Sequence, residues 1–127
     1  MPDPRLCLAN LTVLLVHQID AAYWHEWELF GIPGGNPVNL LLNLPIVALG
    51  LHAWARVALG AADARRWAAF VAALGALTVV LHAGFFAAGH DAFAAPVSIG
   101  LLVATGVLSM LQAIDLRRSR PVRPPLR

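Results

Sequence analysis

Charged residues are scarce in this sequence, lysine is missing altogether, and Cys7 is the single cysteine. One cysteine excludes an internal disulfide and any metal site built from several cysteines. Only 13% of the residues are charged and 59% are hydrophobic, whereas soluble domains average about 25% charged and about 45–50% apolar residues. The composition therefore predicts an integral membrane protein.

Four apolar segments divide the sequence, at residues 6–30, 37–59, 67–88 and 93–116. Each is long enough for a transmembrane helix, which needs about 20 residues. Glycine and proline at residues 31–35, a short charged stretch at 60–66 and Gly89-His90-Asp91 mark the connections. Residues 117–127 hold five arginines and three prolines, which predicts a disordered basic tail. The predicted fold class is all-α, an integral membrane four-helix bundle followed by this tail.

The nine basic residues are all arginines, and they lie at the N-terminus, in the second connection and in the tail. The first and third connections contain none. Because positive charge is retained in the cytoplasm, both termini are predicted to be cytoplasmic. Basic residues at helix ends set orientation, so no nucleic-acid partner is expected. Exclusive use of arginine is typical of a GC-rich genome, and we expect the inner membrane of a bacterium.

Small residues dominate the third segment, and four polar residues follow one face of the fourth: Ser98, Thr105, Ser109 and Gln112. Small side chains let helices approach closely in a membrane. Polar residues spaced at about 100° per residue share a helix face. We therefore predict that these four side chains form hydrogen bonds inside the bundle.

The first segment carries an unusual set of polar residues. On a helical wheel His17, Asp20, Trp24 and Glu28 form one stripe, whereas Glu26 points roughly the opposite way and is expected to be solvated. An ionised side chain at the centre of a bilayer costs about 2.5–3.5 kcal/mol or more. The stripe is therefore a candidate functional site.

Other polar residues fall at the same outer depth, namely Asn39, Asn43, His82 and His90. Imidazole and carboxylate together suit zinc, iron or manganese. We predict a cup open to the outer face, in which His17, Asp20, Glu28, His82 and His90 bind a divalent metal and Trp24, Asn39 and Asn43 line the pocket. A shared site requires the rings of His17 and His82 to lie within about 8 Å of each other, which a modest helix tilt allows.

The run from His17 to Phe30, followed by Pro33-Gly34-Gly35 and Asn39, resembles a family of short bacterial membrane proteins. That family carries a His-x-x-Asp-Ala and a Glu-Trp-x-Leu-Phe signature before a Pro-Gly turn and is known only as a domain of unknown function. The resemblance implies four spans and singles out His17, Asp20, Glu26 and Trp27, but it implies no activity.

Four other interpretations of the polar residues remain open from the sequence. The first is a structural network in which Asp20 pairs with His17 or His82. The second is a small membrane isomerase or hydrolase, in which Asp20 or Glu28 transfers protons beside His17 on a lipophilic substrate. The third is a b-type haem protein with His17 and His82 as axial ligands. The fourth is an accessory subunit of a larger membrane complex, or a homo-oligomer, packed through small-residue helix faces.

Overall fold

Four long helices make up most of residues 1–119, the part of the chain that the computed structural model describes. They are α1 (Pro4–Tyr23), α2 (Gly35–Ala58), α3 (Ala64–Ala87) and α4 (Pro96–Arg118), with a short 3₁₀ helix η1 (Glu26–Glu28) between the first two. Residues 1–119 contain no strand, and all four helices are long and apolar enough to cross a membrane. The prediction of an all-α membrane bundle is confirmed. Most of the predicted tail, residues 120–127, lies outside the described residues.

Local sequence signals set the helix ends. Asp3 caps α1 by accepting a hydrogen bond from the Arg5 backbone N–H at 2.8 Å, and α1 and α4 each have a proline in their first turn, where its fixed φ suits a helix. At the start of α2, Gly34 and Gly35 have φ values of 98° and 61°, which residues with a Cβ rarely adopt. The first helix ends at Tyr23, earlier than the predicted segment 6–30.

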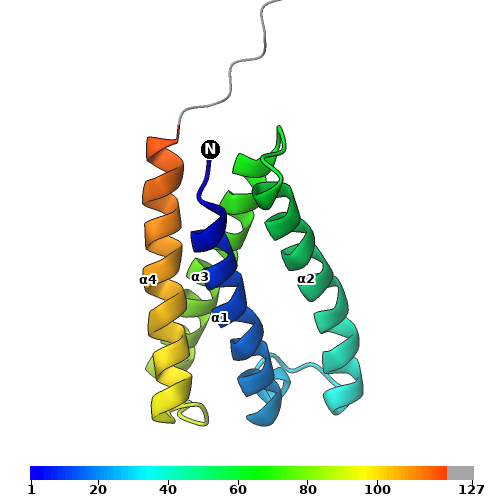
Figure 1. Cartoon of the computed structure of the whole chain (residues 1–127). Helices are drawn as coiled ribbons and strands as arrows, with labels where there is room; N and C mark the ends of the chain where they lie inside the picture. Colours follow the sequence, from blue (N-terminus) through cyan, green and yellow to red (C-terminus); the bar gives the residue numbers. More distant parts are fainter. Residues whose placement is uncertain (120–127) are drawn as a thin grey trace, which may run out of the picture.

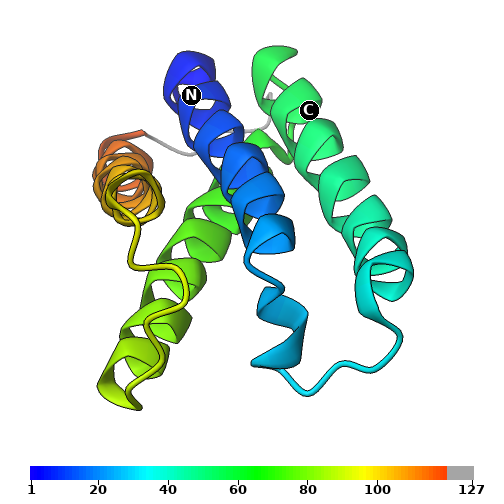
Figure 2. The same ribbon diagram turned by 90° about the horizontal axis from the view of Figure 1, so that it is seen from below.

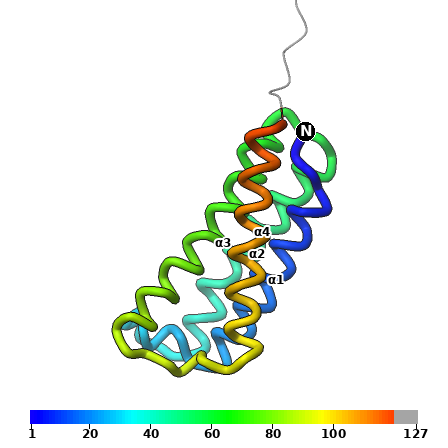
Figure 3. The backbone as a smooth tube through the Cα atoms, turned by 90° about the vertical axis from the view of Figure 1, so that its left-hand side faces the viewer, coloured from blue at the N-terminus to red at the C-terminus, as the bar shows by residue number. Residues whose placement is uncertain are grey.

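The N-terminus and the C-terminal end of α4 lie at the same end of the bundle (Figures 1 and 3). The Asp3 backbone N–H donates to Asp115 Oδ2 at 2.8 Å, and the Ser119 hydroxyl donates to the Met1 carbonyl at 3.0 Å. Arg65, from the start of α3, donates to the Leu116 and Ser119 carbonyls at the C-terminal end of α4. These bonds hold the N-terminus and the start of α3 against the C-terminal end of α4. This end also carries Arg5, Arg56, Arg65 and Arg66 and is called the arginine-bearing end below.

The helices pack unevenly. α1 and α3 contact every other helix, whereas α2 and α4 do not contact each other within residues 1–119. The apolar core is concentrated toward the end that carries the N-terminus, around Cys7, Leu11, Ala53 and Val71. α2 buries only Gly50, Ala53 and Val57, all in its second half, and its first half diverges from α1 (Figures 1 and 2).

A buried hydrogen-bond network joins α1 to α4. Asn10 donates to Ser109 Oγ at 2.9 Å and to Gln112 Oε1 at 2.6 Å, and the Thr105 hydroxyl donates to Asn10 Oδ1 at 2.8 Å. The predicted polar face of α4 is buried in full, and three of its four residues bond as predicted, while Ser98 Oγ has no partner among residues 1–119. The central residue, Asn10, was not predicted from the sequence.

Candidate metal centre

His17, Glu26 and His82 form a buried cluster in the half of the bundle away from the N-terminus. Their side chains come from α1, η1 and α3, and the three residues are 3%, 5% and 3% exposed. One potential ligand atom from each lies within 4.8 Å of the others. The two imidazoles meet edge to face, with ring centroids 4.8 Å apart. The prediction that His17 and His82 face a common interior within about 8 Å is therefore confirmed.

Glu26 reaches this cluster because the helix stops before it. α1 ends at Tyr23, and His25 adopts a left-handed conformation with φ 54°, which is uncommon for a residue with a Cβ. The chain then turns into η1, where Trp27 is buried and stacks on His25 at a centroid distance of 4.7 Å. This reversal directs Glu26 inward. The expectation that Glu26 is solvated is wrong, because it rested on continuing the helix past His25.

The His82 ring is oriented by a hydrogen bond within its own helix. His82 Nδ1 lies 2.8 Å from the Thr78 carbonyl, and Nε2 lies 3.0 Å from Glu26 Oε1. A carbonyl oxygen only accepts, so Nδ1 carries a proton and donates it to Thr78. Nε2 is thereby directed at Glu26 and at the space shared with His17. Metal-binding histidines are commonly held by a backbone carbonyl in this way.

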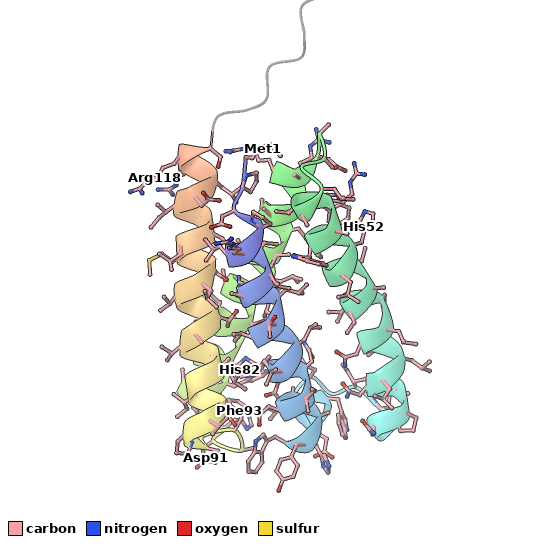
Figure 4. All side chains as sticks on the ribbon, viewed as in Figure 1. Met1, His52, His82, Asp91, Phe93 and Arg118 are labelled. Atoms are coloured by element: carbon pink, nitrogen blue, oxygen red, sulfur yellow. The ribbon has the colours of Figure 1, made fainter. Side chains whose placement is uncertain are left out.

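Aromatic residues cover the cluster at the end of the bundle. Phe93, which is 1% exposed, packs edge to face on His82 at a centroid distance of 4.8 Å, and Phe85 lies against both. Figure 4 shows Phe93 beside His82, near the loop that carries Asp91. His17, Glu26 and His82 are each at most 5% exposed, so the structure does not show the expected open cup. Phe93, from the loop before α4, covers the His82 side of the cluster.

Asp20 borders the cluster one helical turn after His17. Its Oδ1 accepts a hydrogen bond from Trp24 Nε1 at 3.2 Å. Its Oδ2 and His17 Nδ1 are both buried, and neither has a hydrogen-bond partner within residues 1–119. Buried polar atoms without partners are rare in folded proteins, so these two atoms have capacity for a ligand.

Four other residues of the predicted site lie elsewhere. The Glu28 side chain is 71% exposed and lies 3.8 Å from His25, and His90 is exposed after α3. Asn39 and Asn43 bond to each other on α2 and lie against a groove with α1. The structure does not bring these four residues to the cluster. It also separates Glu28 from His17, which removes one of the two carboxyl groups of the predicted enzyme.

The cluster fits a small metal ion in its donor set and size. Two histidines and one carboxylate bind zinc in hydrolases and non-haem iron in oxygenases. Ligands at about 2.0–2.2 Å from a tetrahedral ion are roughly 3.4 Å apart. In the structure the ligand atoms lie within 4.8 Å of one another, and Glu26 and His82 are 3.0 Å apart. Side-chain shifts of about 1 Å would satisfy a metal at these bond lengths.

Haem does not fit the same residues. A haem iron bound by two histidines requires the porphyrin plane to lie between the imidazoles. Here the His17 and His82 rings touch edge to face at 4.8 Å, and Glu26 occupies the adjacent position. The space between the rings is too small for a macrocycle.

Comparisons with known proteins give a family and no activity. No functionally curated protein and no solved structure matches the chain. The model of one protein family, described as a family of unknown function (DUF6713), matches residues 4–119, which include all four helices and the whole cluster. The chain belongs to this family of unknown function, DUF6713.

Proposed function

We propose that this protein binds one divalent transition-metal ion in the cytoplasmic membrane of a bacterium, through His17, Glu26 and His82. The observation that carries the proposal is the convergence of two imidazoles and one carboxylate, all at most 5% exposed, from three separate elements. Zinc, iron and manganese all suit this donor set.

The polarity of the surroundings supports a bound cation. Burying an ionisable group without compensation is costly, and here a carboxylate and two imidazoles are buried together. The Glu26–His82 contact pairs the carboxylate with one imidazole only, while the second imidazole, His17, lies beside them with no hydrogen bond at Nδ1 within residues 1–119. A divalent cation bound by all three side chains compensates the carboxylate charge and uses both imidazoles.

Depth is also consistent between the two histidines. His17 lies six residues before the end of α1 and His82 five residues before the end of α3, or about 9 Å and about 7.5 Å along the helices at 1.5 Å per residue. We place this end of the bundle at the outer face, because the arginines lie at the other end or in the tail. Both termini are then cytoplasmic.

Zinc binding tests the metal proposal directly. Full-length protein, purified in detergent and freed of metal with a chelator, should bind one zinc ion per chain when titrated and analysed for metal content. His17→Ala and His82→Ala should lose most of this binding. His52→Ala and His90→Ala are matched controls, since both residues are exposed, and should bind like the unmodified protein. Equal binding by all four variants would overturn the proposal.

Reporter fusions test the orientation separately. A protein that fluoresces only in the cytoplasm should fluoresce when fused to the C-terminus, and it should stay dark when inserted after Gly34. The opposite pattern would place the metal cluster on the cytoplasmic side.

A further inference from the structure

The groove between α1 and α2, on the side of α1 away from the metal cluster, has polar groups that the metal proposal does not use. Its outer part has a volume of about 480 Å³, and it is lined by Leu15, Gln18, Asn39, Asn43 and Val47 among others. A second cavity of about 210 Å³ shares Leu15 and Gln18 and extends inward to Thr78. Together they have the size of small-molecule sites, which are about 300–1,000 Å³.

The groove lies at the depth of the hydrocarbon. Asn43 is eight residues after Gly35, the first residue of α2, or about 12 Å along the helix at 1.5 Å per residue. The hydrocarbon core is about 30 Å thick, so Asn43 lies inside it, in the outer half. Whatever fills a groove that opens between two membrane-spanning helices at this depth comes from the bilayer. No charged side chain lines either cavity, which favours an uncharged occupant.

The Asn43 amide leaves one unused acceptor in this apolar setting. Its Nδ2 donates to the Asn39 carbonyl at 2.9 Å and to Asn39 Oδ1 at 3.1 Å. A backbone carbonyl only accepts, so the amide nitrogen of Asn43 must face it and Oδ1 must point away. Asn43 Oδ1 is buried and has no partner in the described part of the chain. An unpartnered polar atom in hydrocarbon costs several kcal/mol.

We propose that this groove binds a neutral lipid alcohol, a long hydrocarbon chain that ends in a free hydroxyl. The hydroxyl would donate to Asn43 Oδ1 and accept from the Gln18 side-chain amide, which lines the same cavity. A hydroxyl both donates and accepts. A carboxylate lacks the donor, and an ammonium finds no acidic partner in the lining. The hydrocarbon chain lies along the leucines that line the two cavities, including Leu15, which lines both.

Photolabelling of the full-length protein in phosphatidylcholine vesicles tests this proposal. The probe is a long-chain alcohol with a photoreactive group in mid-chain, and its methyl ether, which lacks the donor, is the matched control ligand. The alcohol should label residues 15–22 of α1 and 36–47 of α2 by mass spectrometry, and an excess of unlabelled alcohol should compete. Labelling by the ether should be roughly tenfold weaker, as the loss of one buried hydrogen bond implies.

Two variants sharpen the test. Asn43→Leu removes the acceptor and should lower alcohol labelling about tenfold, whereas Leu44→Ala, at a position 65% exposed on α2, should label normally. Both should bind zinc like the unmodified protein, since neither Asn43 nor Leu44 belongs to the metal cluster. Equal labelling by alcohol and ether would overturn the proposal without needing a variant to fold. So would cross-linking of α2 to a second copy of the chain in place of the lipid.

Discussion

His82 Nε2 lies 3.0 Å from Glu26 Oε1, although the two residues are 56 positions apart in the sequence. The contact joins α3 to η1, and it exists because the chain reverses after Tyr23 and returns Glu26 to the bundle. The Thr78 carbonyl holds a proton on the other ring nitrogen of His82. Nε2 therefore binds a metal through its lone pair when the ring is neutral, and it donates to the Glu26 carboxylate when both ring nitrogens are protonated. A substitution of Glu26 therefore distinguishes a hydrogen-bonded pair from a metal site.

Glu26→Gln should weaken zinc binding while leaving the bundle folded. The amide keeps the size of the side chain and an oxygen near His82 Nε2, but it loses the negative charge and is a poor metal ligand. We expect the affinity to fall by at least about tenfold, since even changes outside the ligand set cost about 10- to 100-fold. Zinc titration measures the affinity, and far-ultraviolet circular dichroism checks the helices.

Glu28→Gln is the matched control, two residues along the chain and 71% exposed. It should bind zinc like the unmodified protein. Weakened binding in Glu28→Gln together with normal binding in Glu26→Gln would mean that the helical-wheel stripe, and not the observed cluster, holds the metal.

Gly75→Ala should destabilise the bundle, because a Cβ at this position would collide with the hydroxyls of Ser109 and Thr105. These groups belong to the Asn10 network, so they cannot move away without breaking a buried hydrogen bond. Overpacking of this kind costs about 1–3 kcal/mol. Unfolding in mixed detergent micelles measures the free-energy change.

Gly84→Ala, in the same helix, provides the comparison. A Cβ at Gly84 meets nothing within 4 Å, and alanine is favoured over glycine in a helix by up to about 1 kcal/mol. The variant should be as stable as the unmodified protein or slightly more so. Equal destabilisation of both variants would contradict the close α3–α4 contact at Gly75.

The extent of sequence prediction differs between the fold and the site. The four helices follow from apolar runs of bilayer length separated by glycine and proline, since a membrane permits few other structures. The convergence of His17 and His82 also follows. Their positions along the two spans give them a similar depth, and the cost of exposing an ionisable side chain to lipid favours both rings facing the bundle interior. The depth of a side chain and the direction it faces each depend only on the helix that carries the residue.

Glu26 and Asn10 were not predictable in the same way. The wheel for the first segment assumes a helix as far as Glu28, but the left-handed His25 breaks it, and that conformation is stabilised by tertiary contacts such as the burial of Trp27. The Glu-Trp signature at residues 26–27 was the signal that pointed to Glu26. Asn10 is a lone polar residue in an apolar run, and its role depends on where Ser109 and Gln112 lie across the interface.

The free energy of unfolding should depend on pH through Asp63, which lies at the arginine-bearing end of the bundle. Its Oδ1 accepts from Arg56 Nε at 2.8 Å and its Oδ2 from Trp67 Nε1 at 3.0 Å, and the Arg56 hydrogen bond holds the pKa of this carboxyl below its usual value. A lowered pKa in the folded state means that the stabilisation is present above the unfolded pKa. It is lost as the pH falls through the folded pKa.

Asp63→Asn tests this sign. The variant should be less stable than the unmodified protein at neutral pH, and the difference should shrink as the pH falls below the ordinary aspartate range. The effect should be small and weaken with salt, because the pair is over one-third exposed. Asp91→Asn, in the loop at the opposite end, is the control and should leave the pH profile unchanged. A difference between Asp63→Asn and the unmodified protein that stays constant across this range would contradict the ion pair.

Asp20→Asn should lower zinc affinity although Asp20 is not one of the three clustered ligands. A divalent ion bound by Glu26 and two neutral imidazoles leaves one net positive charge inside the membrane, where charge is costly. Asp20, one turn from His17 with a buried Oδ2 that has no partner within residues 1–119, is placed to neutralise that charge. The asparagine keeps an acceptor for Trp24 Nε1, so the local fold should persist while the affinity falls about 10- to 100-fold. Zinc titration of Asp20→Asn beside the Glu28→Gln control separates the two roles. Unchanged affinity would mean that Asp20 serves only to hold Trp24.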